Sequence, residues 1–315
     1  MVLLVMLGVS HFAQAQWDTL ALPFRSITIE DGLSQGMVNT IIQDRYGFMW
    51  FGTKDGLNRY DGYHFEVFRN DPEDSTTLTD NNVLLLFEDR NGRLWVGTDR
   101  GLDLFDRKTD SFHHVLHDLA PGDGSPHQIV QDRNGSLWFS RNDGLLRVDF
   151  GATANETVQA PKVTAVTRVL NRSCWVTMDR SGTIWLSELD GVSYRIDPSR
   201  AGALRMDTVR LDQPLGSTRR GRSLLDLTGM IVVEDTIKNV VYGLHKFGIV
   251  RLDPLTGSVR SIVTYKAPYG DMRTGLASVD SRGRIWICAY PGTFLFHPST
   301  SRMHRVLPMD PNLMH

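Results

Sequence analysis

Few side chains in this sequence stand at spacings that could carry out catalysis or hold a metal ion. The chain has no GxxxxGK(S/T) phosphate-binding loop, no GxSxG nucleophile motif and no HExxH zinc motif. His113 and His114 form the densest histidine pair, but neighbouring residues of a strand point to opposite faces, so we expect a surface pair rather than a shared metal. Residues 89–92 (DRNG) lack the remaining ligands of a calcium loop and predict a turn instead. We therefore predict no catalytic residue, no metal and no cofactor.

The composition excludes several classes of protein. The chain has 315 residues, of which 41% are hydrophobic and 22% charged, as in a globular protein. Its net charge of -2 lacks the basic excess of a nucleic-acid binder, so no nucleic-acid partner is expected. The 28 glycines and 7 tryptophans favour a turn-rich β protein. The two cysteines, Cys174 and Cys288, exclude a disulfide scaffold, and we predict that both are free and buried.

The N-terminus has the features of an export signal. Residues 2–9 (VLLVMLGV) are apolar, and Ala13-Gln14-Ala15 follows as an A-x-A cleavage pattern. This predicts a signal peptide over residues 1–15, although a buried strand or a short core helix is the alternative. Beyond Gln16 no apolar run approaches the ~20 residues that cross a membrane. We therefore expect residues 16–315 to lie outside the cytoplasm.

The rest of the chain is a repeat. An aspartate is followed after three residues by a glycine and after six residues by a tryptophan, and a further glycine stands six residues later. Five copies have this pattern, with tryptophans Trp50, Trp95, Trp138, Trp185 and Trp286. A sixth, degenerate copy has Asp235 and then Tyr242 in place of the tryptophan. Because an aromatic residue recurs at this position from copy to copy, we predict that the tryptophan packs between neighbouring sheets rather than against a ligand.

Each copy predicts four short strands separated by Asp- and Gly-containing turns. Four strands in about 45 residues, repeated radially, predict an all-β fold, a β-propeller of four-stranded blades. The six predicted blade motifs lie at about 38–68, 83–116, 127–150, 172–197, 228–253 and 273–307.

The number of blades in the closed ring stays open at this point. Leu22–Ile29 is predicted to be a lone strand of the kind that pairs with the last blade of a propeller and removes an open edge. Its partner strands would belong to a seventh blade that is absent from the chain. Residues 310–312 (DPN) resemble the link after the first motif, which favours a seven-bladed ring of which the chain holds six blades. A six-bladed ring closed by Leu22–Ile29 is the alternative.

Residues 31–62, and again residues 88–102, closely resemble the blades of two-component regulator propellers. The resemblance covers roughly residues 22–307. It implies the periplasmic sensor of a histidine kinase, often a hybrid kinase of Bacteroidetes-type bacteria. Such receptors have two seven-bladed propellers, an Ig-like domain, one membrane helix and a cytoplasmic kinase, and many sense oligosaccharides. This chain would then be a non-catalytic N-terminal fragment, anchored in the inner membrane only through its missing C-terminal parts and dimeric only through the full-length receptor.

A ligand is expected where the loops into the first strand and the turns between the second and third strands gather around the channel. Their polar side chains mix donors, acceptors and an aromatic ring, as a saccharide requires, although ordinary solvated loops are the alternative. Arg219, Arg220 and Arg222 mark a solvated loop or an anion site. The candidate ligand-binding residues are Asn39, Lys54, Asp55, Asn82, Arg100, Arg141, Asn142, His245, Lys246, Arg273 and Tyr290.

Two other functions compete with the sensor. One is a secreted propeller enzyme, either a lyase or a sialidase-like glycosidase, but the sialidase Asp-box is not met and Glu is scarce in the predicted inner strands. The other is a secreted propeller that binds a partner protein and no small ligand.

Overall fold

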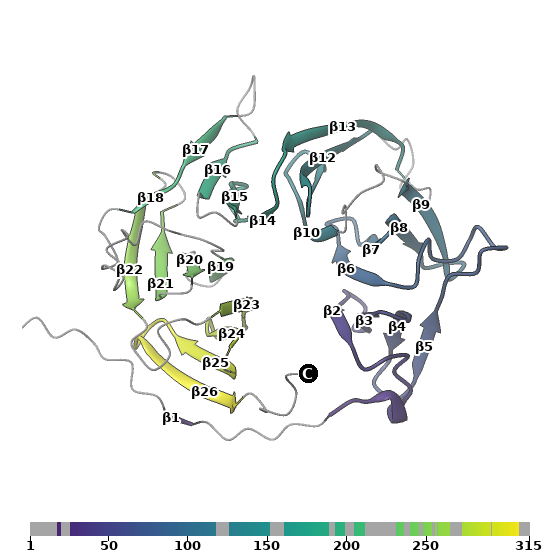
Figure 1. The fold of residues 1–315 in the computed structure, drawn as a ribbon, viewed down its shortest axis with the longest axis horizontal. Helices are drawn as coiled ribbons and strands as arrows, with labels where there is room; N and C mark the ends of the chain where they lie inside the picture. Colours follow the sequence, from purple (N-terminus) through teal and green to yellow (C-terminus); the bar gives the residue numbers. More distant parts are fainter. Residues whose placement is uncertain are drawn as a thin grey trace, which may run out of the picture. The chain divides into compact units, whose positions relative to one another are not determined.

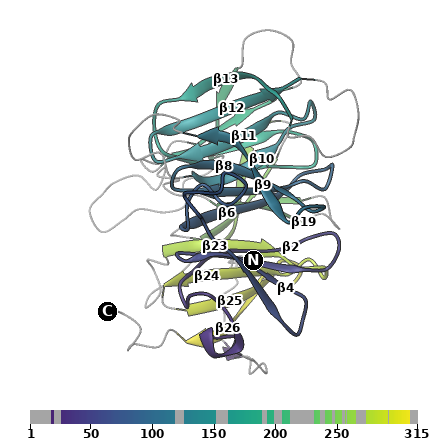
Figure 2. The same cartoon turned by 90° about the vertical axis from the view of Figure 1, so that its right-hand side faces the viewer.

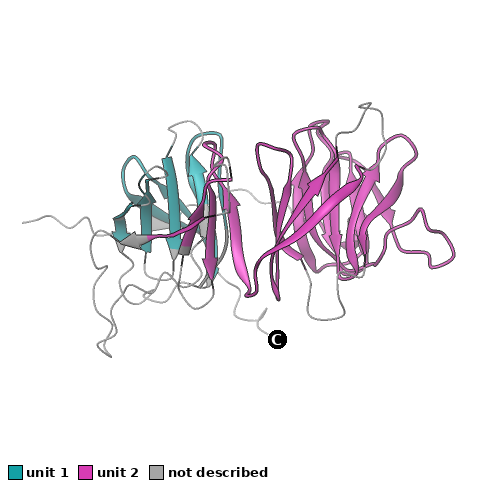
Figure 3. Ribbon diagram, turned by 90° about the horizontal axis from the view of Figure 1, so that it is seen from above, with its two compact units in different colours: residues 1–22, 210–225, 231–315 teal, residues 23–209, 226–230 magenta. Residues whose placement is uncertain are grey.

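The computed structural model describes residues 18–19, 26–117, 126–151, 161–188, 193–198, 205–211, 231–235, 240–245, 248–253, 256, 258–264, 273–290 and 292–308. The protein is an all-β propeller with six four-stranded antiparallel blades (Figure 1). Within the described residues the one helix is a 3-10 turn at Ile29–Asp31. The signal-peptide residues 1–15 lie outside this set. Two compact units divide the chain (Figure 3): unit 1 is Met1–Leu22, Arg210–Leu225 and Ile231–His315, and unit 2 is Pro23–Val209 and Asp226–Met230.

Unit 2 carries blades 1 to 4, whose strands follow one another in chain order. Blade 1 consists of β2 (Val38–Gln43), β3 (Met49–Thr53), β4 (Gly56–Tyr60) and β5 (Phe65–Phe68). Blade 2 consists of β6 (Val83–Glu88), β7 (Leu94–Thr98), β8 (Gly101–Asp106) and β9 (Ser111–His117). Blade 3 consists of β10 (Pro126–Gln131), β11 (Leu137–Arg141), β12 (Gly144–Phe150) and β13 (Val163–Leu170). Blade 4 consists of β14 (Cys174–Met178), β15 (Ile184–Glu188), β16 (Ser193–Ile196) and β17 (Met206–Thr208).

Unit 1 carries blades 5 and 6, each with a fifth strand. Blade 5 consists of β19 (Ile231–Asp235), β20 (Val240–His245), β21 (Gly248–Leu252) and β22 (Ser258–Thr264), and β18 (Arg210–Leu211) pairs in parallel with β22. Blade 6 consists of β23 (Arg273–Val279), β24 (Ile285–Tyr290), β25 (Gly292–His297) and β26 (Arg302–Pro308), as Figure 2 shows.

The N-terminal strand of the last blade lies earlier in the chain than predicted. β1 (Asp18–Thr19) pairs in parallel with His304 and Arg305 of β26. The prediction of a strand at Leu22–Ile29 was wrong over its described part, because residues 26–28 are not in a strand and Ile29 begins the 3-10 turn. Thr28 and Asp31 form a capping box there, which favours a helical turn over an extended strand.

The repeated aspartate closes the turn between the first two strands of a blade. In blade 1, Asp44 Oδ1 accepts hydrogen bonds from the backbone N–H groups of Tyr46 and Phe48, both at 3.0 Å. Its Oδ2 accepts from the indole Nε1 of Trp50 at 2.8 Å. Gly47 completes the turn at a φ of 93°, which a glycine adopts without strain. The same aspartate–indole bond recurs in blades 2, 3, 4 and 6 at 2.8–3.1 Å.

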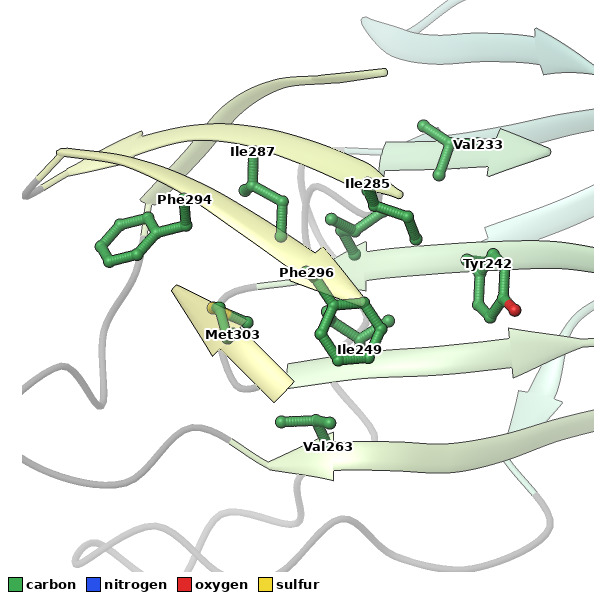
Figure 4. Packing of buried hydrophobic residues seen from close by; sticks show 10 residues of the cluster. Val233, Tyr242, Ile249, Val263, Ile285, Ile287, Phe294, Phe296 and Met303 are labelled. Carbon is green, nitrogen blue, oxygen red and sulfur yellow. The ribbon is translucent and has the colours of Figure 1, made fainter. Parts of the chain in front are cut away.

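Trp50, Trp95 and Trp138 pack between sheets, as predicted, whereas Trp286 of blade 6 is only partly buried. Trp50 is fully buried and lies in one cluster with Leu86 and Val96 of blade 2, and its ring meets Phe105 edge-on at 5.0 Å. Trp95 packs in the same way against Ile129 of blade 3. In unit 1 the core joins blades 5 and 6 (Figure 4), where Phe296 and Met303 lie near Ile249.

Three outer strands extend beyond the predicted motifs. β13, β17 and β22 end at residues 170, 208 and 264, whereas the predicted motifs ended at 150, 197 and 253. Most of β13 is exposed, so its sequence has no alternation of buried and exposed residues that could reveal a strand.

One cysteine prediction was wrong. Cys174 is free and buried, but Cys288 is free and exposed. Cys288 lies on β24 of blade 6, two residues after Trp286. Ile285 and Ile287 of the same strand lie in the core cluster of unit 1, and Cys288, next to Ile287, points to the opposite face.

Candidate functional site

The loops into the first strand and the turns between the second and third strands lie at one end of each blade, which we call the BC end. In blade 1 the turn at Gly56 has a φ of 106°, and the Gly56 N–H donates to the carbonyl of Asn81 at 2.8 Å. Asn81 belongs to the loop into β6, so this bond fixes the turn of blade 1 against the entry loop of blade 2. The rigid backbone at this end positions the polar side chains of both blades.

Three predicted residues of blades 1 and 2 are joined or adjacent at this end. The amide of Asn39 donates to Asn82 Oδ1 at 3.2 Å and to the carbonyl of Val83 at 2.9 Å. Asn82 in turn donates to Asp99 Oδ2 at 2.6 Å. Arg100 follows Asp99 and is exposed. The structure therefore brings Asn39 and Asn82 together in an amide–carboxylate chain with an exposed guanidinium beside it.

Asp55 and Lys54 stand in the neighbouring turn of blade 1. Asp55 pairs with Arg69 at 2.9 Å, and the hydrogen bond from that guanidinium lowers the pKa of Asp55. Lys54 is exposed. The end of blade 1 therefore presents one ion pair and one exposed ammonium group, which can donate hydrogen bonds to a polar ligand.

Blade 3 holds its predicted residues differently. Arg141 is only 2% exposed, and its Nε lies 2.9 Å from Asp143 Oδ1. Asp143 also pairs with Arg168 at 3.0 Å. Asn142 is exposed and hydrogen-bonds His127. Arg141 is thus itself buried in an ion pair, and of the two predicted residues in this turn only Asn142 is exposed.

Three predicted residues of unit 1 lie at the ends of strands. His245, Arg273 and Tyr290 end or begin strands β20, β23 and β24. Their side chains, like Lys246 and the arginines at 219, 220 and 222, lie outside the described residues. Among the residues that the structure does describe, no group of three or more His, Cys, Asp or Glu side chains could hold a metal ion. No helix in that same part of the chain is long and apolar enough to cross a membrane.

Comparison with known proteins identifies two of the blades. Residues 32–55 and 77–100 match the family described as "Two component regulator propeller". Blades 1 and 2 contain two-component regulator propeller repeats. Each matched segment of these repeats holds the turn aspartate, an arginine directly after it and the buried tryptophan.

Sequence relatives of the regulator propeller repeats include a kinase. Histidine kinase P4 of Formosa agariphila is 54% identical over 56 residues, which make up 18% of this chain and 4% of that protein. The chain therefore spans a small part of the length of this relative.

Solved structures share the fold. The extracellular domain of a Bacteroides protein (B. thetaiotaomicron), described as a hybrid two-component system, has a TM-score of 0.66 at 19% identity, and the match covers 95% of this chain and 39% of that one. Virginiamycin B lyase from Staphylococcus aureus has a TM-score of 0.59 at 13% identity, over 84% and 81% of the two chains. At these identities the likeness shows the β-propeller alone, a fold that occurs in sensors and in an enzyme.

Sequence reasoning missed a set of arginines at the opposite end of the regulator propeller repeats. The arginine after the turn aspartate reaches the turn of the next blade: Arg45 donates to the carbonyl of Asp89 at 3.0 Å, and Arg90 donates to those of Gln131 and Asp132 at 3.0 and 3.1 Å. Arg133 repeats this contact with the carbonyl of Arg180 at 3.1 Å. The recurring Asp-Arg dipeptide was the available signal.

Proposed function

We propose that this chain is the extracytoplasmic ligand-sensing propeller of a two-component sensor histidine kinase. The observation that carries the proposal is the match of blades 1 and 2 to regulator propeller repeats, together with 54% identity to a histidine kinase over 56 residues. In this proposal the chain itself is not an enzyme. It is exported to the periplasm, and the signal passes to a cytoplasmic kinase of a longer, membrane-anchored and homodimeric receptor.

The ligand in this proposal is an oligosaccharide bound at the BC end. The chain of Asn39, Asn82 and Asp99 supplies amide and carboxylate groups, and Arg100 and Lys54 supply exposed donors. Sugars are recognised by planar hydrogen-bonding groups of this kind, held on rigid elements. A ligand that prefers one of two receptor states can then shift the equilibrium between them.

Calorimetric titration of the 315-residue chain with a panel of oligosaccharides tests this function. We expect one saccharide class to bind, and Arg100→Ala to weaken its affinity at least tenfold. Asn82→Ala is a second test variant at the proposed site. Asn91→Ala is its matched control, because Asn91 is an exposed asparagine in the turn at the opposite end of blade 2. Equal effects of both asparagine substitutions would contradict a site at the BC end. Turnover of a glycoside, abolished by one acidic substitution, would replace the sensor by an enzyme.

A further inference from the structure

Blades 1 and 2 use the same position of the third strand to hold the segment that enters the blade. In blade 1, Asn58 Oδ1 accepts from the N–H of Ser34 at 2.8 Å, and its Nδ2 donates to the Ser34 hydroxyl at 2.8 Å and to the carbonyl of Phe51 at 3.3 Å. The asparagine is fully buried. Both ends of its amide are therefore satisfied, one as an acceptor and the other as a donor.

Blade 2 has an aspartate at this position. Asp103 stands opposite Val96 in the register of β7 and β8, as Asn58 stands opposite Phe51 in β3 and β4. Its Oδ2 accepts from the N–H and the hydroxyl of Thr79, both at 2.9 Å. Its Oδ1 is buried and has no hydrogen-bond partner. This oxygen takes the place of the Asn58 nitrogen, which in blade 1 donates to a backbone carbonyl.

An ionised carboxylate cannot donate a hydrogen bond, whereas a protonated carboxyl group can. We propose that Asp103 is held as a neutral carboxylic acid whose hydroxyl donates to the backbone carbonyl of Val96, and that this proton makes the entry segment of blade 2 a pH-sensitive latch. The latch consists of residues 76–79, which also bind β9 through the Phe112 N–H to the Thr76 carbonyl at 2.7 Å and through His114 Nε2 to the Thr77 carbonyl at 2.8 Å.

The charged surroundings of Asp103 agree with this assignment. Asp103 is 0% exposed, and this burial is the largest influence on its pKa and raises it. The hydrogen bonds from Thr79 and the charges of His114 and His117 on β9 act in the opposite direction, and the net pKa is raised. Those two histidines are the titratable groups that face it from β9, and their rings meet edge-on at 5.1 Å. Asp80, in the entry loop, binds the N–H of Asn82. At the BC end of blade 1, Asp55 and Arg69 are paired with each other.

The direction of the pH effect follows from proton linkage. When residues 76–79 open, Asp103 meets water and its pKa returns towards about 3.9. The open state therefore holds fewer protons than the closed state between that pH and the raised pKa of the closed state, and rising pH favours opening. The proton leaves to solvent. Because the latch leads directly into Asn82, the device would tie local pH to the loop at the BC end, whether or not that loop binds a saccharide.

Hydrogen exchange of the full 315-residue chain measures this opening. We expect protection of the Thr79 and Phe112 amides, corrected for intrinsic exchange rates, to fall by up to tenfold per pH unit as the pH rises above about 4. Asp103→Asn should remove this dependence, because asparagine can donate as Asn58 does. Asn58→Asp, the matched change in blade 1, should give the Ser34 amide a new pH dependence of the same sign.

Two results would overturn the proposal. One is the same pH dependence of Thr79 and Phe112 protection in Asp103→Asn as in the unchanged protein. The other comes from the unchanged protein alone, so that it does not depend on any variant folding: a carbon NMR titration in which the Asp103 carboxyl ionises with an ordinary pKa of about 3.9.

Discussion

In blade 3 the indole Nε1 of Trp138 donates to Asp132 Oδ2 over 2.8 Å, and both side chains are 0% exposed. The other oxygen of Asp132 accepts from the N–H groups of Asn134 and Ser136 at 2.9 and 3.0 Å. One carboxylate thus satisfies the turn between β10 and β11 and the buried indole that packs on the next sheet. The repeated spacing of aspartate and tryptophan has this physical cause.

Asp132→Ala is therefore expected to destabilise unit 2 strongly. The substitution leaves the buried indole N–H and the buried N–H of Ser136 without an acceptor, and each such buried group costs about 1–3 kcal/mol, whereas the N–H of exposed Asn134 can bind water. Urea unfolding followed by tryptophan fluorescence gives the free energy of unfolding. Glu73→Ala, which changes an exposed acid, is the control, and an equal loss in both variants would contradict a structural role for the aspartate.

In blade 6 the hydrogen bond between the turn aspartate and the tryptophan indole should depend on pH. Burial would raise the pKa of Asp280, but the bonds from Arg284 and Trp286 outweigh it and lower the pKa to about 2. A carboxyl group whose pKa is depressed on folding contributes stability above its unfolded pKa and loses it as the pH falls through the folded value. Stability from this group should therefore decline between about pH 4 and pH 2. We expect Asp280→Asn to unfold with a shallower acid dependence than the unchanged protein in thermal scans, and parallel curves would contradict the assignment.

The arginines after the turn aspartates should stabilise the packing of neighbouring blades, and the stabilisation should grow with the number of carbonyl groups to which each arginine donates. Arg90→Met removes donors to two carbonyls of blade 3, and a net hydrogen bond contributes about 0.5–1.5 kcal/mol. Arg133→Met removes one bond of this kind, to blade 4. Chemical denaturation should show the larger loss for Arg90→Met. Arg90→Lys should restore only part of it, because an ammonium group lacks the planar fork.

Equivalent isoleucines in blades 1 and 3 should differ in their contribution to stability. Ile129 is 7% exposed and packs with Trp95 of the preceding blade, whereas Ile41 at the same position of blade 1 is 55% exposed. Ile129→Ala should cost about 2–5 kcal/mol, as buried truncations do. Ile41→Ala should change the unfolding free energy of this chain by about 0.5 kcal/mol or less. A similar cost at both positions would show that a sheet covers Ile41.

The sequence predicted the parts of the fold that local chemistry determines. Asp44, Gly47 and Trp50 specify a turn and a buried ring by their spacing, so the first two strands and the packing of the tryptophans followed directly. The outer strand β13 was missed because its residues are mostly exposed and show no apolar alternation. The exposure of Cys288 was missed because β24 (IWICAY) is apolar on both faces, so its sequence does not show which face is buried. At the BC end the residue types were visible. The bond that joins Asn39 to Asn82 arises between blades, and the burial of Arg141 beside Asp143 depends on packing that the sequence does not show.

The two thiols should differ greatly in reactivity. Burial and the nearby Glu188 raise the pKa of Cys174 to about 12, so its thiolate is scarce at pH 8, and the side chain is buried as well. Cys288 is exposed. Because the thiolate is the reactive form, a disulfide reagent at pH 8 should modify one thiol rapidly in the folded chain and the second only at the rate of unfolding. Cys288→Ser should abolish the rapid phase, whereas Cys174→Ser should leave it unchanged. Two rapid phases in the unchanged protein would mean that the reagent reaches Cys174 without unfolding. This result would contradict the burial of the Cys174 thiol in β14.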